Sequence, residues 1–63
     1  DGIARDRAEQ LARAAVRRVP GRAVSVEADD GLFEVEVQSR AGAIVEVRLD
    51  DRAAVVGVEQ GEG

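Results

Sequence analysis

The hydrophobic pattern of this chain changes its period at Pro20-Gly21. Over residues 3–19 the apolar side chains recur at three- and four-residue spacing, which places them along one face of an α-helix. Pro20 cannot continue the hydrogen-bond ladder of a helix, and Gly21 can adopt the left-handed turn that often follows one. Beyond this point apolar and polar residues alternate, as in strands with one buried face. The pattern predicts one helix that covers the apolar face of a sheet.

Four segments after Gly21 have the alternating pattern of strands. The clearest is 33–38, in which apolar residues alternate with Glu and Gln. Between the first two segments, Asp29-Asp30-Gly31 favours a tight turn, because Asp can bond to nearby backbone and Gly tolerates a positive φ. The other connections are 39–42 and 50–53. The predicted strands are 23–28, 33–38, 43–49 and 54–59.

These elements predict an α+β fold in which one N-terminal helix packs on a three- to four-stranded antiparallel β-meander. Phe33 is the one aromatic residue of the chain, and we expect it at the centre of a core made otherwise of Ala, Val and Leu. The predicted core comprises Ala8, Leu11, Ala12, Ala15, Val19, Val24, Val26, Phe33, Val35, Val37, Val45, Val47 and Leu49.

The last predicted strand, 54–59, has the weakest pattern. Val55, Val56 and Val58 do not alternate strictly, so the facing of this strand stays open, and Gly57 can mark a bulge. If strand order follows the sequence, the strand lies at an edge of the sheet and Val55 points away from the helix. An edge without Lys or Pro invites pairing with another chain. The sequence therefore predicts a homodimer, formed either through this edge strand or by exchange of the terminal element.

The 63 residues are expected to form one domain, 1–63, with an ordered part of about 3–59. Residues 60–63 have no apolar anchor and are expected to be disordered. The chain contains neither Cys nor His, which excludes disulfides and the commonest zinc ligands. No apolar run approaches the roughly 20 residues that span a bilayer, so direct membrane insertion is not expected.

Charge is divided between the two halves of the chain. Residues 3–22 carry six Arg and two acidic residues, a net charge of +4, whereas residues 23–63 carry three Arg and ten acidic residues, a net charge of −7. Arg13 and Arg17 on the helix and Glu34 and Glu36 on the sheet offer opposite signs to a partner. Nucleic acid is not an expected partner, because the whole chain is acidic and has no aromatic side chain free to stack on bases.

Four carboxylates, Glu27, Glu34, Glu36 and Glu46, are placed by alternation on one face of adjacent strands. Paired carboxylates can bind calcium or act as acid and base, but a flat sheet has neither the loop carbonyls of a calcium site nor a catalytic cleft. We interpret the four as a solvated outer face, and the Asp29-Asp30 and Asp50-Asp51 pairs as turn formers. No metal or cofactor site is predicted.

The side chains needed for nucleophilic catalysis are almost absent. Ser25 and Ser39 are the only hydroxyl residues, and no His, Lys or Tyr is present to act as a base. The sequence therefore predicts that the domain is not an enzyme.

Several short motifs follow one another along nearly the whole chain. They are Ala8 and Ala12 in the helix, the Pro20-Gly21 stop, the Asp29-Asp30-Gly31 turn, Phe33-Glu34-Val35-Glu36-Val37, and a Gly42-led strand that ends at Leu49-Asp50. Their order and spacing resemble those of the PepSY domain. The chain departs from the family pattern at Ala4, where Ser or Thr is favoured, at Phe33, where Tyr is common, and at Ala53, where Gly often stands.

The resemblance implies an extracytoplasmic module of the kind found in propeptides of secreted metallopeptidases and in bacterial cell-envelope proteins. It implies a non-catalytic protein-binding role, with a secreted or envelope peptidase as the partner whose activity is restrained. The alternative is a structural or assembly domain within a larger secreted or membrane-anchored protein. The expected partners are thus a protein, a peptidase by resemblance, or a second copy of the chain.

Overall fold

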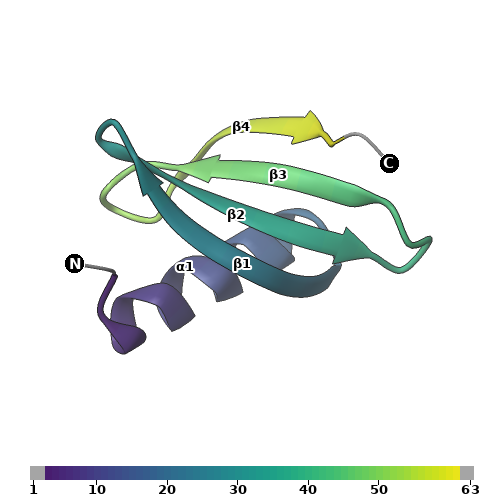
Figure 1. Cartoon of the computed structure of the whole chain (residues 1–63), viewed down its shortest axis with the longest axis horizontal. Helices are drawn as coiled ribbons and strands as arrows, with labels where there is room; N and C mark the ends of the chain where they lie inside the picture. The colour runs from purple at the N-terminus through teal and green to yellow at the C-terminus, as the bar shows by residue number, and fades with distance from the viewer. Residues whose placement is uncertain (1–2, 62–63) are drawn as a thin grey trace.

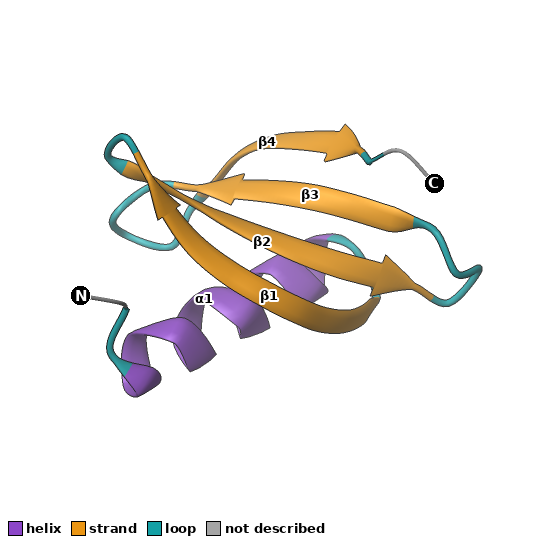
Figure 2. Cartoon of the chain, viewed as in Figure 1, coloured by secondary structure: helices purple, strands orange, loops and turns teal. Residues whose placement is uncertain are grey.

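One helix packs on one face of a four-stranded antiparallel sheet in a computed structural model that describes residues 3–61 (Figure 1). Strands that follow one another in the chain are neighbours in the sheet, and the second face of the sheet is not covered by any described element (Figure 2). The predicted α+β meander is confirmed. Its elements are α1 (Arg5–Arg18), β1 (Gly21–Asp29), β2 (Leu32–Ser39), β3 (Ile44–Leu49) and β4 (Val55–Gln60).

Helix α1 begins and ends close to the predicted limits. Ala4 is its N-cap and has no side chain that can accept a hydrogen bond from the first turn. At the other end Val19 is extended, and its N–H donates to the Ala15 carbonyl at 2.9 Å. Pro20 follows directly, so the helix stops where the sequence predicts.

Three hairpin turns join the strands, and two of them repeat one geometry. Asp30 and Gly31 have φ of 54° and 86°, the pair of positive values that a two-residue type I′ turn requires. In the β2–β3 and β3–β4 turns, Gly42 (φ 92°) and Ala53 (φ 65°) occupy equivalent left-handed positions. All three turns close antiparallel pairs of consecutive strands.

The fully buried core consists of six apolar side chains, all of which the sequence predicts. Two come from α1 and four from the inner face of β2 and β3, the two central strands. Val19, Val26 and Phe33 are half-buried and pack against this group, while Ala8, Ala12 and Val45 are also half-buried. The six are Leu11, Ala15, Val35, Val37, Val47 and Leu49.

Phe33 does not lie at the centre of the core, contrary to the prediction. It is half-buried at the start of β2, next to the first turn of the sheet, and pairs with Leu49 on β3. Near its N-terminal end α1 places Arg7 beside Phe33, with the guanidinium carbon 5.3 Å from the ring centroid. Leu11 and Leu49 are the largest fully buried side chains instead, and Leu49 is the direct cross-strand neighbour of Phe33 on β3.

Val24 was predicted inside, but its side chain is 48% exposed. The pairing of β1 with β2 shifts by one residue between Ala23 and Ser25, so Val24 is the extra residue of a β-bulge. On either side of the bulge, Ala23 and Val26 both face the core and pack against it. β1 bends strongly over α1 (Figure 1). Simple alternation fails here because it assumes an unbroken ladder.

The last strand also contains a bulge, and its facing differs from the prediction. Val55 pairs with Leu49 and packs against the core, whereas Val56 is the extra residue and is 55% exposed. The bulge thus precedes Gly57 by one residue. The predicted disorder at 60 is also corrected, because Gln60 ends β4 and the Gly61 N–H donates to the Ile44 carbonyl. Residues 62–63 lie outside the described part.

Gly21 has a different role from the one predicted. It is the first residue of β1 and has no left-handed φ. A Cβ atom placed on it would lie 2.3 Å from the carbonyl oxygen of Gln38. Glycine is therefore needed because β1 and β2 approach closely at this end of the sheet.

Candidate functional site

The outer face of the sheet carries the predicted carboxylates in two rows that cross the strands. The first row runs from Glu27 through Glu34 to Arg48. The second runs from Ser25 through three glutamates, Glu36, Glu46 and Glu59. The four glutamates named by the sequence do share this face. Glu59 also lies on this face. The sequence did not predict it there, because the facing of the last strand was left open.

Hydrogen bonds and ion pairs tie most of these side chains to one another. Arg48 lies 3.5 Å from Glu34 and 3.2 Å from Glu59. Ser25 Oγ donates to Glu36 Oε1 at 2.9 Å. Within residues 3–61, Glu46 has no ion-pair partner, although it stands directly between two other glutamates. Like charges on this face therefore stand opposite one another at Glu46, and also where Glu27 faces Glu34.

The outer face does not form a metal-binding arrangement among residues 3–61, where no three acidic side chains come close enough to hold an ion. The two serines form hydrogen bonds within the domain. Ser25 bonds to Glu36, and Ser39 Oγ accepts from the Ala43 N–H at 3.2 Å. What this face offers chemically is a flat, negatively charged surface.

The aspartate pairs serve the turns. Asp30 takes up the left-handed conformation of the first turn. In the last turn, Asp50 Oδ1 accepts from the Arg52 N–H at 2.9 Å and from the Ala54 N–H at 3.0 Å. The hydrogen bond from Ala54, followed by that from Arg52, lowers the pKa of Asp50 below its ordinary value of 3.8.

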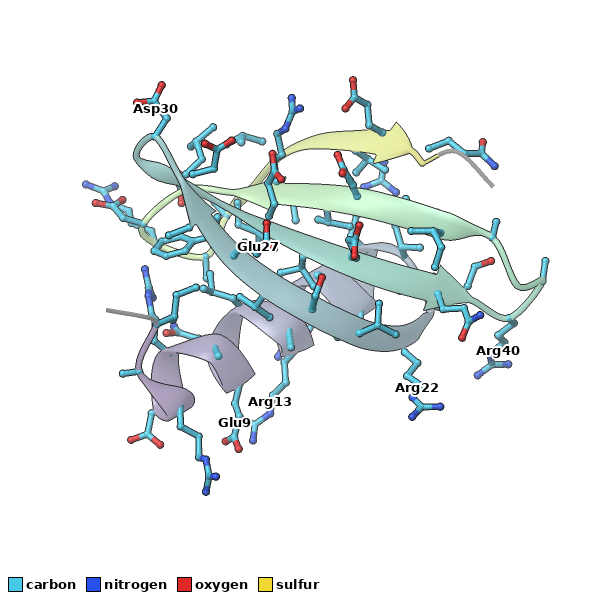
Figure 3. All side chains as sticks on the ribbon, viewed as in Figure 1. Glu9, Arg13, Arg22, Glu27, Asp30 and Arg40 are labelled. Carbon is cyan, nitrogen blue, oxygen red and sulfur yellow. The ribbon has the colours of Figure 1, made fainter. Side chains whose placement is uncertain are left out.

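The arginines of α1 divide into one that is tied to the sheet and others that face solvent. Arg7 donates to Gln10 Oε1 at 2.8 Å and to the main-chain oxygen of Asp51, while its guanidinium group lies over Phe33. Figure 3 shows Glu9 and Arg13 projecting from α1 away from the sheet. The basic helix face thus lies on the side of the molecule opposite the acidic sheet face.

A hollow of about 650 Å³ opens between the start of α1 and the end of β1. Its floor is apolar and is formed by Val26, Ala28 and Phe33, while Ile3 and Ala4 form one wall. Arg7 contributes the charged group at its margin, and Glu27, whose side chain is on the outer face of the sheet, also lines it. Arg7 is held over Phe33, which fixes a positive charge beside an apolar depression.

The hollow lies beside the free edge of the sheet. Asp29 and Leu32 flank the two-residue turn and form a hydrogen-bonded pair. Because hydrogen-bonded pairs alternate along an antiparallel ladder, every second residue of β1 counted back from Asp29 forms main-chain hydrogen bonds to β2, and the residues between them do not. By this alternation Val26 and Ala28 direct their main-chain N–H and C=O groups away from β2. The same two residues line the hollow. A free main-chain edge and an apolar depression therefore coincide.

Sequence reasoning did not identify this hollow. The residues that line it come from the start of the chain, the helix and two strands. In the sequence each of them fits the pattern of its own helix or strand, so none indicates a shared site. Phe33 is half-buried at the margin of the core and forms part of the floor of the hollow.

Comparison with known proteins found no match to this chain among family models, curated proteins or solved structures. The resemblance to the PepSY domain therefore stays a prediction. In the part of the chain that the structure describes, no helix has the length and apolar character needed to cross a membrane.

Proposed function

We propose that this domain is a non-catalytic protein-binding module that takes an extended segment of a partner protein along β1. The observation that supports the proposal is the coincidence of the hollow with the unpaired edge at Val26 and Ala28. A segment that adds to a sheet edge gains main-chain hydrogen bonds, and pockets beside the edge select its side chains. The hollow accepts one apolar side chain of that segment.

Charge at the margin of the hollow adds a second element of selection. Arg7, on the helix side of the hollow, favours an acidic residue in the bound segment. The preferred segment is therefore extended, with an apolar anchor and an acidic neighbour on the side of α1. Following the resemblance, we propose that the segment belongs to an extracytoplasmic peptidase, which is restrained by steric occlusion.

The proposal is tested by selecting binding peptides from a random display library and titrating them into the isotope-labelled domain. The expected amide shifts lie along β1 and at Arg7 and Phe33. Ala28→Glu places a charged side chain in the hollow and should abolish binding, since Ala28 is exposed and tolerates the change. Val24→Glu is the matched control, because Val24 is on the same strand but outside the hollow. Equal binding by the Ala28→Glu variant would refute the site.

The identity of the partner requires a second measurement. The domain and its Ala28→Glu variant are used as bait against the secreted and envelope fractions of the source cells at low and high salt. A peptidase retained by the parent domain and lost by the variant supports restraint of that enzyme. Recovery of no partner favours the alternative, a structural or assembly domain.

A further inference from the structure

β4 forms the other edge of the sheet, away from the β1 hollow, and its surface is unusually apolar for an edge. Val56 is 55% exposed and Val58 is 40% exposed; together they make up two of the three exposed large apolar side chains in the described part of the chain. Natural edge strands are commonly protected by Lys or Pro, and β4 has neither. Its one charged residue is Glu59.

The main chain of β4 presents its free groups at defined positions. The Gly61 N–H donates to the Ile44 carbonyl at 2.7 Å, so Gly61 faces β3. In an antiparallel ladder the residues alternate, and Glu59 and Gly57 therefore also face β3. Val58 and Gln60 direct their N–H and C=O groups outward, where no described strand is present to pair with them.

We propose that β4 pairs antiparallel with β4 of a second copy, about a two-fold axis at Val58, and joins the two sheets into one. Each Val58 then stands opposite Val58 of the second copy, on the helix side of the sheet, where α1 leaves it partly uncovered. An isologous contact of this kind uses the same patch on both copies and closes on itself. The β1 hollow lies on the opposite edge and stays open.

Charge complementarity identifies a second copy as the occupant. Arg48 pairs with Gly57, whose missing side chain lets the Arg48 guanidinium group reach toward the edge, 3.2 Å from Glu59. In the proposed pairing Glu59 stands opposite Gly57 of the second copy, and Arg48 of that copy is next in the row. Each Glu59 thereby lies between two arginines, its own and that of the second copy.

The alternative pairings of the same edges are less favourable. Because Val58 and Gln60 carry the outward groups, two other two-fold registers exist, centred on Glu59 or on Gln60. The first places Glu59 opposite Glu59 of the second copy, which adds like charges to an already acidic row. The second pairs only the end of the strand and leaves Val58 outside the contact.

Single-cysteine cross-linking tests the pairing and its register, since the chain has no cysteine of its own. Val58→Cys should form an intermolecular disulfide under mild oxidation, because residues directly opposite in a ladder lie about 5.5 Å apart between Cα atoms, within disulfide range. Glu59→Cys and Val24→Cys should not, the latter being an exposed valine on the opposite edge. Cross-linking at Glu59 or Val24 in preference to Val58 would overturn the proposal.

Sedimentation over a concentration series measures the same association without cysteine. The parent chain should pass from 6.7 kDa to twice that mass. Val58→Lys opposes two cations at the axis and should weaken the dimer by at least about tenfold. Val24→Lys, at similar exposure on the other edge, should leave it unchanged. A parent chain that stays monomeric at the highest concentration, or equal effects of the two Lys variants, would contradict β4 pairing.

Discussion

Ala4 leaves the N-terminus of α1 without a side-chain acceptor, although its backbone already has the geometry of an N-cap (φ −58°, ψ 146°). Ala4→Ser should therefore stabilise the domain by about 1 kcal/mol, because the hydroxyl accepts a free N–H of the first turn. Ala4→Gly should fall only a few tenths of a kcal/mol short of the Ser variant, because Gly is also favoured at an N-cap. Urea denaturation measures both. Equal midpoints for the Ser variant and the parent chain would contradict this account of the cap.

Asp50 is the residue for which the structure predicts a pH effect. Its pKa is lowered in the folded state by hydrogen bonds from the Ala54 and Arg52 amides. A lowered folded pKa means that its contribution to stability is present above the unfolded value, near 3.8, and is lost as pH falls through the folded value. Asp50→Asn should therefore lose less stability than the parent chain between neutral and strongly acidic pH. Parallel pH profiles from thermal unfolding would refute this.

At the scale of the element, the outer face of β3 carries an unfavourable side-chain pairing. Glu46 stands between Glu36 and Glu59 on the neighbouring strands. Glu46→Arg should stabilise the domain by about 0.5–1 kcal/mol, because it replaces two like-charge pairs with opposite-charge pairs. Salt should reduce the gain, since the groups are near the surface.

Glu46→Gln separates the two contributions to this effect. It removes repulsion without adding an ion pair and should recover part of the gain with little dependence on salt. Denaturation at low and high salt gives the comparison. A Glu46→Arg variant no more stable than the parent at low salt would show that the three glutamates do not repel appreciably.

At the scale of the whole molecule, stability should depend most on the side chains beneath the middle of α1. Leu11 is fully buried, so Leu11→Ala should cost about 2–5 kcal/mol and unfold much of the population of so small a domain. Phe33 is half-buried at the margin, so Phe33→Ala should cost less, about 1–2 kcal/mol. Denaturation midpoints rank the two. A larger loss of unfolding free energy for Phe33→Ala than for Leu11→Ala would contradict the marginal position of Phe33.

Periodicity predicted the elements, their order and the six fully buried residues, because helix and strand periods depend only on local geometry. It failed at Val24 and Val55, where bulges shift the facing by one residue. Whether a bulge forms depends on how strongly the sheet must bend around α1, which is a property of the assembled fold. The outer glutamates followed from alternation, whereas the hollow at Phe33 is lined by residues of separate elements that only the assembled fold brings together.

Both edges of the sheet are open, and we propose that they have different roles. Residue-resolved amide hydrogen exchange tests this directly. In dilute protein, the Val26 and Val58 amides should exchange fast, while Glu27 and Glu59 beside them should be protected by pairing within the sheet. Concentrating the protein should protect Val58 and leave Val26 unchanged. Protection of Val58 equal to that of Glu59 at every dilution, or no change with concentration, would contradict the account.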